Sequence, residues 1–172
     1  KLYKMKNLLM AGLLGGLVSL GSCTANNGGA FSKGKEAQAQ RVEFLKLKGD
    51  WEITSVDYNK NYRVKPFDSG ADAQCFVGSH WKLTPNNYTG SYTLAGGGAC
   101  PAITQPISFE VVNGTEFKFK HLAEGTKAKS VTSGYSLNLV SQTDNNFVLE
   151  QNIPSNGEIV KVSYNFQKIA TK

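Results

Sequence analysis

The sequence predicts an all-β protein, an eight-stranded up-and-down antiparallel β-barrel preceded by a short helix. From residue 49 onward, apolar and polar residues alternate in eight short runs, the pattern of strands with one face toward a core and one toward water. Asn, Gly, Pro and Asp residues that favour turns separate these runs. Gly49-Asp50-Trp51 opens the first run, and we expect Trp51 to plug the closed end of the barrel. A two-sheet β-sandwich has the same alternation and is the structural alternative.

Composition suits one globular domain and argues against nucleic-acid binding. Forty per cent of the 172 residues are hydrophobic, which is enough for a real core. The net charge is +6, but three of the 19 basic residues lie in the first 22 positions, which leaves 16 basic against 13 acidic residues in the rest of the chain. A surface so nearly balanced in charge is unlike that of a nucleic-acid-binding protein.

Residues 1–22 have the layout of a bacterial lipoprotein signal peptide. Lys4 and Lys6 precede an apolar run from Leu8 to Leu20, which is shorter than the about 20 apolar residues of a spanning helix. Leu20-Gly21-Ser22-Cys23 then resembles a lipobox, so Cys23 is predicted to receive a diacylglyceryl group and become the new N-terminus. Two or more acyl chains anchor a protein stably to a membrane. The alternative is an ordinary signal peptide with a cysteine there by chance.

Between this anchor and the barrel, residues 23–40 are predicted to form a flexible polar tether, and residues 41–170 the barrel domain. A short helix is expected over Glu36 to Lys48, with Val42, Phe44 and Leu45 packing on one end of the barrel. No acidic cluster follows Cys23, which favours an outer-membrane location facing the periplasm.

Each predicted strand is defined by the apolar positions that share one face. We expect the inward face to be formed by Trp51, Ile53 and Ser55; Trp81 and Leu83; Tyr88, Gly90, Tyr92 and Leu94; Ile107, Phe109 and Val111; Phe117 and Phe119; Val131, Tyr135, Leu137 and Leu139; Phe147 and Leu149; and Val160, Val162, Tyr164 and Phe166. Short links place each strand beside the one before it. Closure into a barrel removes the exposed edges of such a sheet.

Several motifs resemble the lipocalin family, whose calycin-type barrels share three signatures. Gly49-Asp50-Trp51 is similar to the Gly-x-Trp of the first strand, and Thr143-Asp144-Asn145 to the Thr-Asp-Tyr of a later loop, with Asn145 in place of tyrosine. Lys168 stands where the family has a basic residue, usually arginine, over the tryptophan. More narrowly, residues 73–81, Thr89-Gly90-Ser91-Tyr92 and Gly134-Tyr135 resemble the lipocalin-like domain of bacterial lipoproteins, over residues 41–170 in all.

The resemblance places the longest predicted connection, from Tyr58 to Gln74, at the open mouth of the barrel. Tyr62, Pro66 and Phe67 supply it with apolar side chains. It is therefore expected either to act as a lid over the mouth or to fold onto the rim as plain packing.

Cys75 and Cys100 lie on opposite arms of the second and third predicted strands, about equally far from the turn that joins them. Antiparallel pairing brings them toward the same end of that hairpin, and an exported protein meets an oxidising compartment, so we predict a disulfide. A metal pair and free thiols are the alternatives, and the spacing does not favour a metal site.

The inward aromatic residues are candidates for a ligand pocket, because eight strands enclose either a solid core or room for one small ligand. Small inward residues, Gly90 and Ser133, favour some space. The candidate pocket residues are Tyr92, Phe109, Phe119, His121, Tyr135, Gln151 and Tyr164. His121 and Gln151 could hold the polar end of a ligand, or be rim residues with ordinary partners.

The sequence favours a binding protein over an enzyme. It has two histidines, neither in a metal-ligand spacing, and no nucleophile with a positioned base stands out. A hydrolase or isomerase using His121 and Tyr135 is a minor alternative. We expect no cofactor, no metal and a monomer.

Lys118, Lys120, Lys127 and Lys129 form a basic strip that faces either anionic lipid headgroups or solvent. The functional prediction is a membrane-anchored lipoprotein that carries a small hydrophobic or amphipathic ligand in the cell envelope. The alternative is an envelope interaction module whose barrel is filled and binds no ligand.

Overall fold

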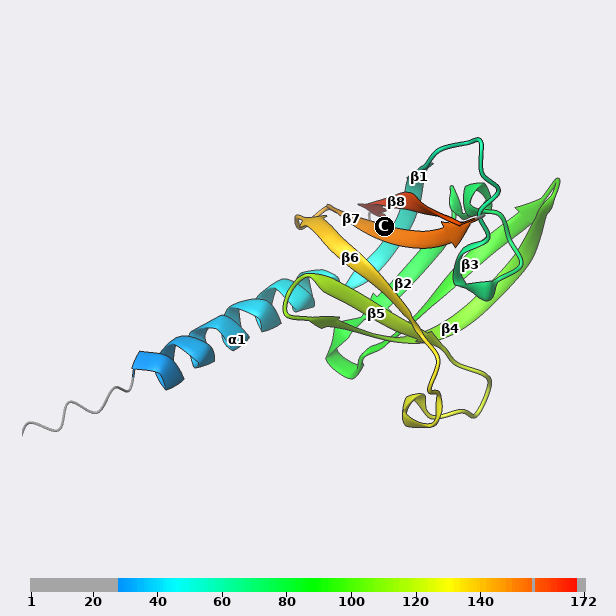
Figure 1. Ribbon diagram of the computed structural model, residues 1–172. Coiled ribbons are helices and arrows are strands. Elements are labelled where there is room, and N and C mark those ends of the chain that lie inside the picture. The colour runs from blue at the N-terminus through cyan, green and yellow to red at the C-terminus, as the bar shows by residue number, and fades with distance from the viewer. Residues whose placement is uncertain (1–27, 156, 170–172) are drawn as a thin grey trace, which may run out of the picture.

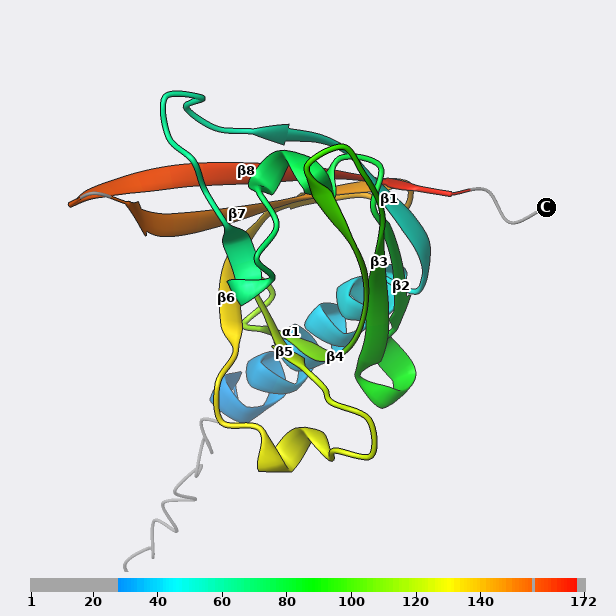
Figure 2. The same ribbon diagram turned by 90° about the vertical axis from the view of Figure 1, so that its right-hand side faces the viewer.

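The computed structural model describes residues 28–155 and 157–169, with side chains from residue 33 onward. Eight strands form one closed antiparallel barrel in chain order, and the last strand pairs back with the first (Figures 1 and 2). The predicted up-and-down barrel is therefore confirmed over the sandwich alternative. The helix and strands are α1 (Gly28–Lys46), β1 (Gly49–Asp57), β2 (His80–Thr84), β3 (Thr89–Gly97), β4 (Cys100–Val112), β5 (Glu116–His121), β6 (Tyr135–Gln142), β7 (Asn146–Ser155) and β8 (Glu158–Lys168).

The predicted inward faces agree with the buried residues along most strands, with two instructive differences. In β1, a bulge between Ile53 and Ser55 shifts the register against β8, so Val56 is buried where the alternation predicted Ser55. A bulge adds one residue to one strand and so reverses the side that the following residues face. Tyr88 was also predicted to face inward, but it precedes β3 in a left-handed conformation and its side chain is exposed.

Trp51 closes one end of the barrel, as the sequence predicted. Its indole is fully buried, donates a hydrogen bond from Nε1 to the carbonyl of Leu47 at 2.9 Å, and packs edge-on against Phe147 at 4.7 Å. The Lys168 Nζ lies 5.1 Å from the centre of the indole, so the predicted cation over the tryptophan is present. Lys168 also donates to the carbonyl of Asp144 at 3.3 Å, which ties the β6–β7 loop to the same closed end.

In the same loop, Thr143 of the Thr143-Asp144-Asn145 signature stabilises the turn. Thr143 Oγ1 accepts hydrogen bonds from the backbone N–H groups of Asn145 and Asn146. Gly49 has a φ of 138°, a conformation that favours glycine, and a Cβ there would lie 3.0 Å from the Lys168 side chain. The signature residues thus converge on the plug and its cation.

The N-terminal helix is longer than predicted. It begins at Gly28 rather than at Glu36, so residues 28–40 are helical and the prediction of an irregular tether is wrong for them. Apart from Gly34, residues 33–40 are good helix formers (Lys, Glu, Ala and Gln), and their side chains are exposed. Only its last turns pack on the barrel, with Phe44 buried, and the rest of α1 projects from the closed end (Figure 1). No helix in the described part of the chain is long and apolar enough to cross a membrane.

The predicted disulfide joins Cys75 to Cys100. It links the end of the long first connection to the start of β4, with 5.4 Å between the two Cα atoms. The connection is thus fixed at its C-terminal end.

Candidate functional site

The connection between β1 and β2 folds into the open mouth of the barrel and brings apolar side chains with it. Two short 3₁₀ helices, η1 (Pro66–Asp68) and η2 (Ala73–Phe76), give it shape. Val64, Phe67 and Phe76 are all buried. In this structure the connection closes the mouth, so its apolar residues are part of the barrel interior.

Phe67 occupies the centre of this mouth. Its side chain is 3% exposed although it belongs to a loop. Its ring centroid lies between 5.0 and 5.5 Å from four other rings, those of Phe76, Phe119, Tyr135 and Tyr164. Phe67 has a φ of 59° and Asp68 a φ of 47°, a left-handed backbone that is uncommon for non-glycine residues. The loop therefore holds a strained conformation that places one aromatic ring inside the barrel.

Asp68 fixes that ring from the rim. The Tyr135 Oη donates a hydrogen bond to the Asp68 Oδ2 at 3.1 Å. Burial, together with the nearby Asp68 carboxylate, raises the pKa of Tyr135 to about 12, so the phenol remains a donor at neutral pH. The contact links the loop to β6 next to the inserted ring.

His121 and Tyr92 form a second polar pair in the mouth. The Tyr92 Oη and His121 Nε2 are 3.0 Å apart, and the His121 ring is 5.0 Å from the ring of Tyr135. Burial lowers the pKa of His121, against the opposing effect of Asp68, and burial raises the pKa of Tyr92. Both groups are therefore neutral near pH 7, and each can take part in a hydrogen bond to a ligand.

Tyr164 and Gln151 form a third pair. The Tyr164 Oη donates to the Gln151 Oε1 at 3.2 Å, and burial raises the pKa of the phenol. Since the Tyr164 ring contacts Phe67, this pair also borders the space that the loop ring fills.

The structure brings together all the predicted pocket residues except Phe109. Phe109 is buried nearer the closed end, where its ring stacks on Phe117 at 5.4 Å and contacts Phe44 of α1 at 5.5 Å. Sequence reasoning did not assign Asp68 and Phe76 to the site. Phe76 stands next to Cys75, so the predicted disulfide is a sequence signal that could have placed Phe76 near the mouth.

The small residues expected to leave space do not do so. A Cβ on Gly90 would lie 2.6 Å from the carbonyl oxygen of Lys82, so this glycine allows close strand packing. Ser133 is exposed and lies before the start of β6.

Comparisons with known proteins found similar solved structures only. No family model and no curated protein sequence matches the chain. Similar solved structures include bovine odorant-binding protein in complex with a selenium-containing odorant, with 12% identity, a TM-score of 0.43, and coverage of 75% of this chain and 74% of that one. The bovine lipocalin allergen Bos d 2 has 13% identity and a TM-score of 0.44, with coverage of 76% and 77%.

The barrel is lipocalin-like. That description follows from the strand order, the indole plug and the cation above it.

Proposed function

We propose that this protein binds a small apolar or amphipathic ligand in the mouth of its barrel. The observation that carries the proposal is Phe67: a ring supplied by a loop occupies an aromatic site built by the barrel wall. A loop can withdraw where a strand cannot, so a ligand of similar size can replace that ring. The surrounding hydroxyl, imidazole and amide groups of Tyr92, His121 and Gln151 would hold the polar end of the ligand.

The energetics allow such an exchange. Burying the Phe67 ring stabilises the closed loop by roughly 3 kcal/mol, while its left-handed backbone opposes closure by about 1 kcal/mol. A ligand that buries about 200 Å² of apolar surface gains about 5 kcal/mol at the same rate per unit area. Before the entropy cost of association is subtracted, this gain exceeds the net stability of the closed loop by about 3 kcal/mol, so a ligand that buries more surface than the Phe67 ring is favoured. The Cys75–Cys100 bond leaves only the part of the loop before η2 free to move.

The location is the second part of the proposal. A lipid on Cys23 would anchor the chain to the outer membrane of the bacterial envelope, facing the periplasm. Residues 1–22 and Cys23 lie outside the described residues. Metabolic labelling with palmitate tests the anchor, and Cys23→Ser is its control: label in the wild type and none in the variant supports the proposal.

Native mass spectrometry of the gently purified protein tests the ligand. The expected result is a bound species of added mass that denaturing spectra lack, together with saturable enhancement of N-phenylnaphthylamine fluorescence. Competition between the bound species and the fluorescent probe would assign both to one site. A protein with neither added mass nor probe binding contradicts the proposal and favours the alternative of a filled barrel that contacts other proteins.

A further inference from the structure

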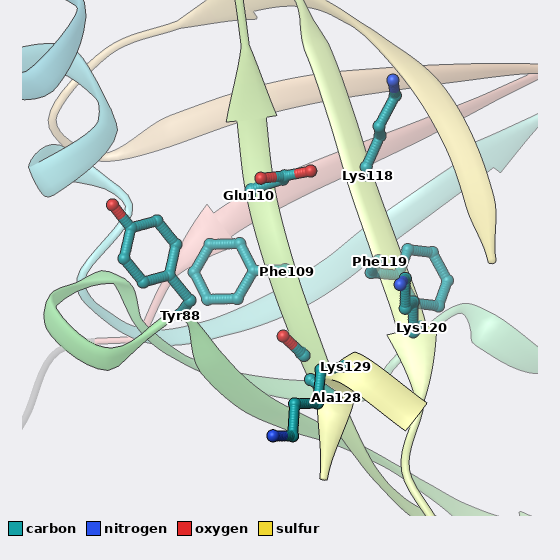
Figure 3. Close-up of a pocket in the computed structure, with 9 residues that line it drawn as sticks. Tyr88, Phe109, Glu110, Lys118, Phe119, Lys120, Ala128 and Lys129 are labelled. Carbon is teal, nitrogen blue, oxygen red and sulfur yellow. The ribbon is translucent and has the colours of Figure 1, made fainter. Parts of the chain in front are cut away.

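A groove of about 230 Å³ lies on the outer face of β4 and β5 (Figure 3). Phe109, Phe119 and Ala128 form its apolar lining, and the ring of Phe119 also borders the barrel mouth. The polar lining of the groove consists of Tyr88, Ser108, Glu110, Lys118, Lys120 and Lys129, and we call it the outer groove. A second hollow adjoins it, shares Tyr88 and Glu110, and adds Gln40 and Arg41 of α1. The helix and the barrel wall therefore border two hollows that meet at Tyr88 and Glu110.

The charges of the outer groove are unequal. Three lysines stand against one carboxylate. Lys118 is paired with Glu116 at 3.1 Å, whereas in the part of the chain that the structure describes no ion pair includes Lys120 or Lys129. Lys120 donates to the carbonyl of Val131 at 2.8 Å, which fixes its ammonium group beside the groove. Strand register places Ser108 directly opposite Lys120, so a hydroxyl donor stands next to that cation. This end of the outer groove suits an anion.

Glu110 and Tyr88 give the other end a different chemistry. Register places Glu110 opposite Lys118, and it belongs to none of the ion pairs among the described side chains. A carboxylate accepts hydrogen bonds from hydroxyl groups and repels anions. A simple phosphate site would not include it, whereas a ligand with hydroxyls at one end and an anion at the other would use it.

Tyr88 is held as an exposed aromatic surface. Its ring stacks on Phe44 at 5.4 Å with an interplanar angle of 27°, and the Arg41 guanidinium lies 5.8 Å from the ring centre. The side chain is 47% exposed, and its φ of 59° is a strained conformation for a bulky residue. Strain of this kind concentrates at functional sites. An exposed ring of fixed orientation can pack against the C–H face of a sugar ring.

We propose that the outer groove binds an acidic sugar, either carboxylated or phosphorylated. The anionic group lies between Ser108, Lys120 and Lys129. The ring packs on Tyr88, and its hydroxyls donate to Glu110. The polar groups of this site are different from those of the barrel mouth, so the proposal stands whether or not the mouth binds a ligand.

Titration of the full chain with glucose 6-phosphate, followed by NMR chemical shifts, tests the proposal, with glucuronic acid as the carboxylated analogue. Both should shift the signals of Tyr88 and Ser108, and should bind at least about tenfold more tightly than glucose or inorganic phosphate alone, since each control lacks half of the contacts. Lys129→Gln should weaken binding about fivefold, the range of one exposed charge pair. Lys127→Gln is the matched control, because Lys127 is on the same loop but does not line the groove.

Tyr88→Asn should also weaken binding while tolerating the left-handed backbone, so it separates loss of the ring from loss of the fold. Vesicles of phosphatidylcholine containing phosphatidylinositol distinguish the source: if they compete with glucose 6-phosphate, the sugar is carried on a lipid, and if they do not, it is free. The proposal is overturned if glucose 6-phosphate binds no better than phosphate, or if Lys127→Gln weakens binding as much as Lys129→Gln.

Discussion

Replacing Phe67 by alanine separates the two tasks of that ring, which stabilises the fold and fills the mouth. The substitution removes an aromatic ring that is 3% exposed and contacts four other rings. A buried Phe→Ala change typically lowers the free energy of unfolding by about 3–5 kcal/mol. We expect a loss of about 3 kcal/mol, because a loop can partly collapse into the space. Phe67→Gly should be more stable than Phe67→Ala by about 1 kcal/mol, since glycine relieves the left-handed backbone.

The same substitution should tighten ligand binding. If the closed loop, with Phe67 in the mouth, is favoured over the open loop by about 2 kcal/mol, only about 3% of the wild-type molecules have a vacant site. The apparent Kd of the wild type is then raised about 30-fold. Alanine removes this competition and leaves apolar room that a benzene-like group can refill. Phe67→Ala should therefore bind an apolar probe about 30-fold more tightly than the wild type, although it is less stable.

Fluorescence titration with N-phenylnaphthylamine and chemical denaturation measure the two effects on one preparation. Phe147→Ala is the matched control, because Phe147 is equally buried but packs at the closed end, 4.7 Å from Trp51 and 4.2 Å from Phe166. It should lose similar stability and gain no affinity. Equal probe affinity in the wild type and both variants would refute the reasoning, because Phe67 would then be ordinary core packing.

Three further predictions concern the closed end, the disulfide and the mouth. Lys168→Met should lower the free energy of unfolding by about 0.5–2 kcal/mol, because it removes the cation above Trp51. Lys168→Arg keeps a cation there and should retain most of this stability. Urea denaturation measures both variants, and equal losses would argue against a cation–π contribution. Replacing both Cys75 and Cys100 by serine should lower the melting temperature and remove about 3.5 kcal/mol of stability, the loop-entropy value for their 25-residue separation. An unchanged melting temperature after reduction of the wild type would contradict this prediction. Burial lowers the pKa of His121, so its contribution to stability is complete above the unfolded-state pKa and is lost as the pH falls through the folded-state pKa. Between about pH 8 and about pH 5, the melting temperature should therefore fall less steeply in His121→Gln than in the wild type. Identical slopes would exclude this histidine as the source of the pH dependence.

The barrel could be predicted because its signals are local. Alternation such as that of Val160, Val162, Tyr164 and Phe166 appears along the chain itself, and these residues all face the core. The indole plug followed from Gly49-Asp50-Trp51 for the same reason. The bulge in β1 and the left-handed turn at Tyr88 broke the alternation without leaving a mark in the residue types, so the faces of Val56 and Tyr88 were wrongly predicted.

Apolar periodicity and turn residues by themselves determined the number of strands and, along most of them, the side that meets the core, since each depends on neighbours within a few positions. The tertiary structure decided between a closed barrel and a sandwich. Tertiary structure alone decided that Phe67 fills the mouth and that Tyr88 lines a groove with lysines some thirty to forty residues away. A loop side chain settles where distant strands leave apolar room for it, and that room exists only after the barrel has closed.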